Sequence, residues 1–273
     1  MKNAWLICSA VVLSALPQPT GPAPGAVVVI GGGGIPEAVY SRTLDLAGGV
    51  AARVVVLPQA SAREDAGAES VARWRAAGAR AVTLIDGADP AADRERVAAA
   101  DLIWMPGGSQ VRLLDALAEV DLIELVRARH AAGAVVAGTS AGAAVLSERM
   151  ITGRADLESI TAEATETLAG LALWPGVIVD QHALRRRRLN RLISAVLDAP
   201  RLVGVAVDEA TAVVVHGERL EVLGESGVVV IDARRARVAR SAAGSPAAGT
   251  GLTLHILRAG MELDLGPQDS EER

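Results

Sequence analysis

Short apolar runs alternate with helical patterns along the first two thirds of this chain. The runs that predict buried strands are residues 26–30, 53–57, 81–85, 102–105, 134–137 and 177–179. Segments with apolar residues at helical spacing lie between most of them. Because strands that alternate with helices usually form a parallel sheet with right-handed crossovers, we expect helices on both faces of one sheet.

The last third of the chain has a different pattern. Short strands are predicted at residues 202–207, 212–215, 221–223, 228–231 and 252–257. They follow an arginine-rich helical pattern and predict an antiparallel extension of the same sheet. Residues 242–251 are mostly small and predict a loop, and residues 268–273 are a charged end. The predicted fold class is therefore α/β, with three layers and a mostly parallel sheet.

The first 25 residues differ from the rest. Residues 1–3 carry a positive charge, residues 4–16 are apolar, and residues 17–25 are rich in proline. This order is typical of a secretory signal peptide, and the apolar part is shorter than the about 20 residues that span a bilayer. We expect a leader over 1–25, one domain over 26–273 and an extracytoplasmic (periplasmic or secreted) mature protein with no membrane attachment. A misassigned start codon on a cytoplasmic protein is the alternative.

Composition fits a single enzyme-sized domain with an aliphatic core. The 273 residues are 51% hydrophobic but only 2% aromatic. Cys8 is the only cysteine and lies in the leader, so the mature chain has no thiol for a disulfide or a metal site. A net charge of −5 without a long basic stripe argues against nucleic acid as a partner.

The strongest chemical motif is the sequence Gly-Thr-Ser-Ala-Gly over residues 138–142. It follows a predicted strand and precedes the small-residue start of a helix. A strand, a G-x-S-x-G turn and a helix form a nucleophile elbow, in which the turn projects the serine hydroxyl. We therefore take Ser140 as a candidate nucleophile.

A serine nucleophile requires a base, and the chain has four histidines. His130 ends a helical pattern, His216 lies in a turn and His255 in a strand, which are structural positions. His182 comes directly after the predicted strand 177–179, at the carboxyl end where open α/β sheets bind their ligands. It is the expected general base.

The acid that would orient the base is left open by local sequence. The carboxylates between the serine and the histidine are Glu148, Asp156, Glu158, Glu163, Glu166 and Asp180. Most exposed carboxylates are only solvated, and nothing in their immediate neighbours ranks these six.

A run of arginines follows His182. Leu189, Leu192, Ile193 and Val196 form a buried helical stripe. Arg186, Arg188 and Arg191 are candidates for carboxylate recognition, because the guanidinium fork matches a carboxylate bidentately. Arg187 points away and is expected to be solvated.

Four consecutive glycines, residues 31–34, follow the first predicted strand. They complete neither a dinucleotide-binding fingerprint nor a P-loop. We interpret them as a tight turn rather than a nucleotide site.

Several segments in this order resemble the cyanophycinase family of serine exopeptidases, which includes related aspartyl dipeptidases. They are the four glycines, Leu-Pro-Gln-Ala-Ser at 57–61, Pro-Gly-Gly-Ser-Gln at 106–110, the elbow, the segment 170–182 ending in Asp-Gln-His, and Val-Asp-Glu-Ala-Thr-Ala at 207–212. Together they span almost all of residues 26–265.

The resemblance implies roles for individual residues. Ser140 would be the nucleophile, His182 the base and Glu158 the orienting acid, eighteen residues past the serine as in the family. The residues implied in binding are Gly108 and Ala141 for the oxyanion and Gln110, Asp180, Gln181, Arg186, Arg188 and Arg191 for the substrate, with Asp180 expected to meet a cationic arginine side chain.

The resemblance also implies a fold like that of class I glutamine amidotransferases and a peptide or polymer substrate rich in aspartyl and arginine units. That substrate would be cyanophycin, an aspartate backbone with arginine side chains, cleaved to β-aspartyl-arginine dipeptides without metal or cofactor. A homodimer is left open. Ser109 stands where the family usually has Asp or Asn, and Ala183 replaces a common aromatic, so the pocket shape is expected to differ.

Three alternatives stay open at this point. The first is an aspartyl dipeptidase that acts on other peptides. The second is an α/β-hydrolase esterase, against which only forty-two residues separate the serine from the histidine. The third is an inactive binding protein on the same scaffold.

Overall fold

The structure is a computed structural model that describes residues 23–266. The predicted leader therefore lies outside the described residues except for its last three positions, and so does the charged end of the chain. No helix in the described part of the chain is long and apolar enough to cross a membrane.

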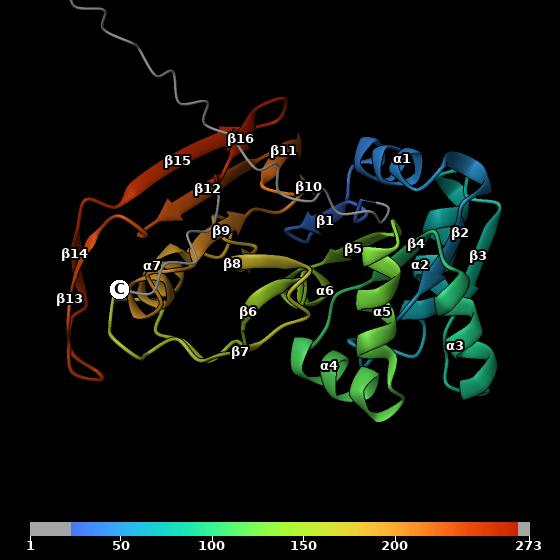
Figure 1. Cartoon of the computed structure of the whole chain (residues 1–273), viewed down its shortest axis with the longest axis horizontal. Helices are drawn as coiled ribbons and strands as arrows, with labels where there is room; N and C mark the ends of the chain where they lie inside the picture. The colour runs from blue at the N-terminus through green and yellow to red at the C-terminus, as the bar shows by residue number, and fades with distance from the viewer. Residues whose placement is uncertain (1–22, 267–273) are drawn as a thin grey trace, which may run out of the picture.

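Two main sheets organise the chain (Figure 1). Within residues 23–266 the first has eight strands, in the order β16 (Glu262–Asp264), β11 (Arg219–Gly224), β10 (Thr211–His216), β1 (Val27–Ile30), β5 (Val135–Thr139), β4 (Leu102–Met105), β2 (Arg53–Val56) and β3 (Ala81–Leu84). The second has six, in the order β15 (Thr253–Arg258), β12 (Gly227–Asp232), β9 (Val203–Val207), β8 (Trp174–Gln181), β6 (Ser147–Ile151) and β7 (Thr167–Ala169). A small hairpin joins β13 (Arg237–Ala239) to β14 (Ala248–Thr250).

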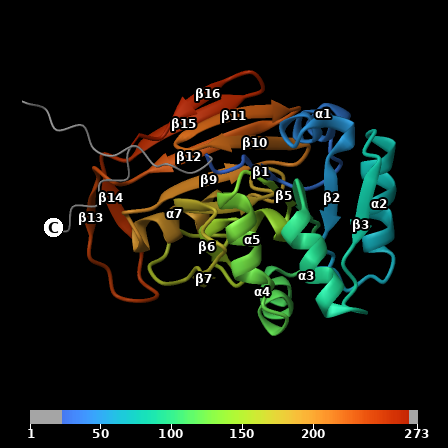
Figure 2. The ribbon, with the colours of Figure 1, turned by 45° about the vertical axis from the view of Figure 1, so that its right-hand side comes forward.

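The helices are short. They are α1 (Glu37–Leu46), α2 (Ala66–Ala76), α3 (Pro90–Ala99), α4 (Gln110–Glu119), α5 (Leu122–Ala131), α6 (Ala141–Ala144) and α7 (Leu189–Asp198), with a 3-10 turn η1 (Gly49–Ala51). Figures 1 and 2 both show α2 beside β2 and β3 at one end of the molecule, and β13 and β14 at the other end.

Alternation along the strands separates the cores. In β1, Val27 and Val29 join a core with α3, α4 and α5, whereas Val28 and Ile30 join a core with α1 and α2. Successive side chains of a strand point to opposite faces, so the parallel part of the first sheet lies between two helical layers. This confirms the predicted α/β class.

The second sheet is a correction to the prediction of one sheet. Strand β8 is expected in the parallel part of the first sheet. It lies in the second sheet, where it pairs in parallel with β6 and β9. Strands β10 and β11 extend the first sheet in antiparallel fashion as predicted, but β9, β12 and β15 do not. The apolar runs of these strands are buried in either arrangement, so their pattern does not say which sheet they join.

The two sheets share one core. Val177 and Val179 of β8 lie in the core that also contains Val29 of β1, while Ile178 faces the core under α7. Helix α7 therefore covers the outer face of the second sheet, and the carboxyl ends of β1, β5, β8 and β9 meet near one another. The predicted loop at 242–251 contains β14, a further correction.

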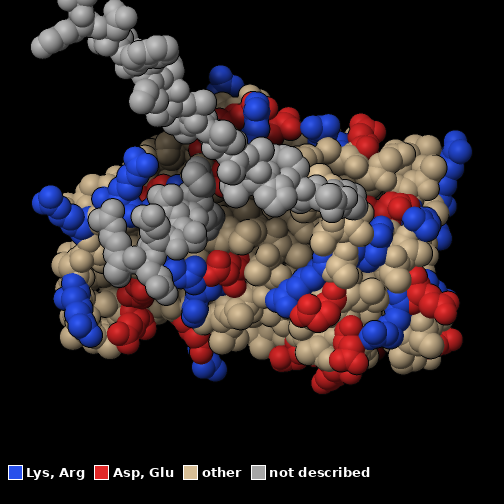
Figure 3. Space-filling model, viewed as in Figure 1, with Lys and Arg blue, Asp and Glu red and all other residues tan. Residues whose placement is uncertain are grey.

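Charges of both signs are interspersed on the face drawn in Figure 3. Arg side chains there are interspersed with Asp and Glu, as expected for a solvated surface.

Candidate active site

Ser140 lies on a strained turn between β5 and α6. Its φ of 52° and ψ of −111° are unusual for a residue with a side chain. The flanking glycines make the turn possible, because a Cβ on Gly138 would lie 2.2 Å from the carbonyl oxygen of Gly142, and one on Gly142 would lie 1.9 Å from that of Met105. The elbow is therefore formed as predicted, with its serine only partly buried.

His182 lies directly after β8 and points at this serine. Its Nε2 is 2.9 Å from the Oγ of Ser140. The backbone N–H of His182 donates to the carbonyl oxygen of Gly31 at 2.8 Å, which ties the end of β8 to the end of β1. His182 also has a positive φ, 53°, so both reacting side chains are held on turns that the surrounding structure maintains.

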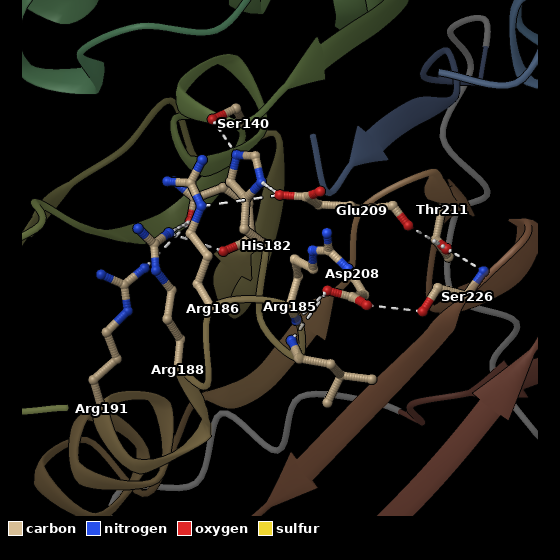
Figure 4. Close-up of polar contacts among 12 residues, drawn as sticks. Ser140, His182, Arg185, Arg186, Arg188, Arg191, Asp208, Glu209, Thr211 and Ser226 are labelled. Carbon is tan, nitrogen blue, oxygen red and sulfur yellow. Dashed lines mark hydrogen bonds and ion pairs between the residues drawn. The ribbon is translucent and has the colours of Figure 1, made fainter. Parts of the chain in front are cut away.

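Glu209 completes the chain of hydrogen bonds (Figure 4). Its Oε1 is 2.7 Å from the Nδ1 of His182. Because a carboxylate only accepts, Nδ1 carries the proton and Nε2 accepts from the hydroxyl of Ser140. Nucleophile, base and orienting acid are thus in line.

The acid expected from the resemblance is elsewhere. Glu158 is exposed in the loop between β6 and β7, and its backbone N–H donates to Asp156 at 2.8 Å. No contact joins the Glu158 side chain to His182 within residues 23–266. The prediction of Glu158 is therefore corrected to Glu209, which follows β9, the strand that runs parallel to β8 and next to it.

A sequence signal for Glu209 did exist. It comes two residues after the buried run 202–207, at the carboxyl end of a strand, which is the same argument that selected His182. Glu209 follows the histidine in the chain and is therefore not among the six carboxylates between Ser140 and His182.

Burial sets the basicity of the histidine. Desolvation lowers the pKa of His182 below its ordinary value, the hydrogen bond that its Nδ1 donates to Glu209 opposes this, and the nearby charge of Arg186 lowers the pKa further. The imidazole is therefore neutral at pH 7, the form that can accept the proton of Ser140.

The turn after β4 passes the nucleophile. A Cβ on Gly107 would lie 3.2 Å from the Cβ of Ser140, so the turn runs directly past the serine. Gly108 has a φ of 148°, and a Cβ there would lie 2.0 Å from the carbonyl oxygen of Ala60. Ala141 is the first residue of α6. Their roles as oxyanion donors remain predictions.

Comparison with known proteins decides the family. The model of peptidase family S51 matches residues 27–223. The chain belongs to peptidase family S51. It is therefore a peptidase, and the sequence resemblance is confirmed.

Related proteins cover most of this S51 peptidase. A cyanophycinase from Geminocystis herdmanii (strain PCC 6308) is 35% identical over 85% of this chain and 90% of its own length. One from Thermosynechococcus vestitus (strain NIES-2133 / IAM M-273 / BP-1) is also 35% identical, over 86% of this chain and 78% of its own.

Two solved structures share the fold. A peptidase from an acI-B1 actinobacterium superposes with a TM-score of 0.64 at 20% identity, covering 88% of this chain and 97% of that one. A putative peptidase E from Listeria monocytogenes EGD-e gives a TM-score of 0.55 at 17% identity, over 75% and 100%. At these identities the likeness concerns the fold alone.

Two residues expected in the substrate pocket of the peptidase are paired with each other. Asp180 is fully buried and Arg191 is 3% exposed. The Nε of Arg191 donates to Asp180 at 2.8 Å, and a second nitrogen of the same fork also contacts that carboxylate. Asp180 is thus satisfied inside the protein, and the expectation that it meets a substrate side chain is corrected.

Two glutamines of the predicted pocket have internal partners. The buried side-chain amide of Gln110 donates to the carbonyl oxygen of Ile151 and joins α4 to β6. The backbone carbonyl oxygen of Gln181 accepts from the guanidinium group of Arg188 at 3.0 Å. Both contacts join parts of the protein to each other.

Arg186 and Arg188 lie beside the catalytic chain. They precede α7 rather than lying in it, because the helix begins at Leu189. The Nε of the half-exposed Arg186 is 3.9 Å from Glu209. Desolvation and the charge of Arg191 lower the pKa of Arg188 to about 10, so it stays cationic at neutral pH. Its Nε is buried with no hydrogen-bond partner in the described part of the chain.

The two residues that depart from the family pattern, Ser109 and Ala183, both lie close to the site in the chain and have defined surroundings. Ser109 caps α4, with its hydroxyl accepting from the backbone of Arg112 at 3.3 Å. Ala183 is fully buried next to His182. Within residues 23–266 no group of three or more His, Cys, Asp or Glu is placed to hold a metal ion.

Proposed function

We propose that this S51 peptidase is a serine exopeptidase that hydrolyses cyanophycin or a related β-aspartyl peptide. The observation that carries the proposal is the line from Ser140 through His182 to Glu209, with contacts of 2.9 and 2.7 Å. A serine, a neutral imidazole and a carboxylate in this order are what acyl transfer requires.

In this reaction Ser140 attacks the peptide carbonyl while His182 takes the hydroxyl proton. Glu209 holds the ring and stabilises the imidazolium that forms. The same proton then passes to the leaving amine as the peptide bond breaks and an acyl-enzyme remains. Water, deprotonated by His182, hydrolyses the ester and restores Ser140.

The negative charge that forms on the carbonyl oxygen of the substrate needs hydrogen-bond donors to stabilise it. The backbone amides of Gly108 and Ala141 are the proposed pair, because one lies on the turn beside the serine and the other follows it. Fixed amides at such a position typically contribute about 3–4 kcal/mol to the transition state.

The substrate class follows from the cations beside the serine. Arg188 presents a buried Nε without a partner among residues 23–266, and Arg186 is half-exposed next to it. Guanidinium groups bind carboxylates bidentately, so they suit the free carboxylate of an aspartyl unit. Relatives that are 35% identical to this chain over 85% and 86% of its length are named cyanophycinase. Because Asp180 is occupied by Arg191, a cationic substrate side chain must be recognised elsewhere.

Insoluble cyanophycin provides the test. Incubation with wild-type protein should release soluble β-aspartyl-arginine dipeptides, and Ser140→Ala should release none. A parallel incubation with soluble β-aspartyl and α-aspartyl dipeptides separates the two substrate classes. Hydrolysis of dipeptides alone would assign the protein as an aspartyl dipeptidase, and no hydrolysis of either would refute the proposal.

We further propose that the mature enzyme acts outside the cytoplasm. The support is the order of charged, apolar and proline-rich segments in residues 1–25. Amino-terminal sequencing of protein from cell fractions of the native host tests it. A mature end near Ala26 in an extracytoplasmic fraction is expected, and an intact Met1 in the cytosol would contradict it.

A further inference from the structure

The turn that carries His182 begins without a local cap. Within it, the N–H groups of Arg186, Arg187 and Arg188 donate to the carbonyl oxygens of residues 182, 184 and 183. The first N–H groups of such a helical turn have no partner inside it and need an outside acceptor. The preceding residues, Gln181, His182 and Ala183, include none of the short polar side chains that usually cap a turn.

Asp208, which directly follows β9, supplies that acceptor (Figure 4). Its Oδ1 accepts from the backbone N–H of Leu184 at 3.1 Å and of Arg185 at 2.8 Å. Its Oδ2 accepts from the hydroxyl of Ser226 at 2.8 Å. Asp208 is only 7% exposed, so these charge-assisted bonds form away from bulk water.

The position of Asp208 in the chain makes this cap relevant to the reaction. It directly precedes Glu209, so one short segment after β9 contacts both the side chain of His182 and the turn that follows it. Glu209 binds the imidazole ring, and Asp208 binds the backbone of the turn that follows. Thr211 fixes the segment itself, because its hydroxyl donates to the carbonyl oxygen of Glu209 at 3.1 Å and accepts from the backbone of Ser226 at 2.9 Å.

His182 needs such support. Its positive φ of 53° is a conformation that costs on the order of 1–3 kcal/mol and persists only where the surroundings enforce it. If the turn relaxed, the imidazole would lose its alignment with Ser140. The two arginines beside it, Arg186 and Arg188, lie on the same turn and would move with it.

We propose that Asp208 is a positioning residue that keeps His182 in line between Ser140 and Glu209. It acts through backbone hydrogen bonds and does not touch the reacting atoms. The inference rests on the proposed serine-peptidase function. Its test therefore uses a fluorophosphonate probe, which labels an activated serine whatever the peptide substrate is.

Three variants separate positioning from general stability. Asp208→Ala removes the cap, whereas Asp208→Asn keeps an oxygen for the two N–H groups and offers its amide to Ser226. Asp93→Ala is the matched control, because Asp93 is also buried and accepts a loop N–H, that of Gly87 at 3.0 Å, but lies on α3 away from the site. Thermal unfolding of each variant identifies a temperature at which all are folded.

The expected results differ among the variants. Asp208→Ala should slow labelling of Ser140 and kcat for dipeptide release by about 100-fold, the usual cost of displacing a catalytic group by roughly 1 Å. Asp208→Asn should stay within about fivefold of wild type, and Asp93→Ala within about twofold, since neither moves the imidazole.

Other outcomes overturn the inference. A folded Asp208→Ala protein that labels within about threefold of wild type would show that the cap does not position the base. An Asp208→Asn protein as slow as Asp208→Ala would assign the effect to charge rather than to the hydrogen bonds. Wild-type protein that does not label at all would overturn the proposed function together with this inference.

If Asp208→Ala does not fold, hydrogen exchange in the wild-type protein tests the cap on which the inference depends. The backbone N–H groups of Leu184 and Arg185 belong to exposed residues, yet both bind Asp208. Their exchange should be at least about 100-fold slower than in an unstructured peptide. Exchange at the unstructured rate would contradict the proposed cap.

Discussion

Replacement of Gly32 by alanine should disable the base while leaving the fold in place. Gly32 lies against the ring of His182, with a φ of +106°. A Cβ at this position would lie 2.2 Å from Cε1 and 2.4 Å from Nε2 of that ring. The loop cannot readily withdraw, because its carbonyl oxygens at Gly31 and Gly32 accept from the backbones of His182 and Ala210 at 2.8 and 3.0 Å.

The size of the effect follows from these distances. Carbon atoms in contact normally lie about 3.5–4.0 Å apart, so the imidazole must move by more than 1 Å. Such a movement breaks the 2.9 Å contact with Ser140 and should lower kcat by about 100-fold. Alanine at a positive φ also costs about 1–3 kcal/mol of folding stability. That would lower Tm by roughly 2–4 °C for each kcal/mol in a domain of this size.

Gly34→Ala is the matched control. Gly34 is exposed, has no positive φ, and a Cβ there meets nothing within 4 Å. We would measure kcat, KM and Tm of both variants on a β-aspartyl-arginine peptide, with fluorophosphonate labelling of Ser140 as an independent readout. Gly34→Ala should match wild type. A Gly32→Ala enzyme with kcat within about threefold of wild type would refute the reasoning, since a 1 Å displacement should cost far more.

Three further predictions follow from the site. Glu209→Gln should lower kcat by about 10²–10⁴-fold, whereas Glu158→Gln should have almost no effect; comparable losses in steady-state assays would contradict the assignment. Burial lowers the pKa of His182 against the opposing effect of Glu209, so kcat/KM should persist as pH falls below about 6.5 and decline only when the ring takes up a proton. A pH–rate profile with its midpoint above that value would count against a buried base. Asp180→Asn leaves Arg191 buried without its counter-charge and should destabilise the fold by about 3–5 kcal/mol, without changing the preference between arginine- and lysine-bearing peptides in the folded protein. Lost preference at an unchanged Tm would return Asp180 to the substrate pocket.

Much of this site could be predicted from local pattern. The elbow at Ser140 and the place of His182 at a strand end follow from apolar runs, glycines and one histidine. These signals are contained within a few neighbouring residues, and the local backbone geometry that they require leaves few alternatives. The arginines next to His182 were also recognised, although the helix begins after most of them.

The acid and the pocket could not be predicted in the same way. The strand-end position that selects His182 makes Glu209 a candidate as well, but only the pairing of β8 with β9 brings it to the imidazole. The family resemblance implies that Asp180 and Arg191 are pocket residues. In the fold they turn inward and neutralise each other.

The division has a physical reason. The sequence by itself determined the long apolar strands, the nucleophile and the base, because each depends on the periodicity and turn chemistry of a short segment. Which sheet a strand joins depends on pairing between segments far apart in the chain, and an apolar run is equally well buried in either sheet. Only the tertiary structure therefore decided that the end of β9 meets the end of β8, and with it the choice of Glu209 and the cap supplied by Asp208.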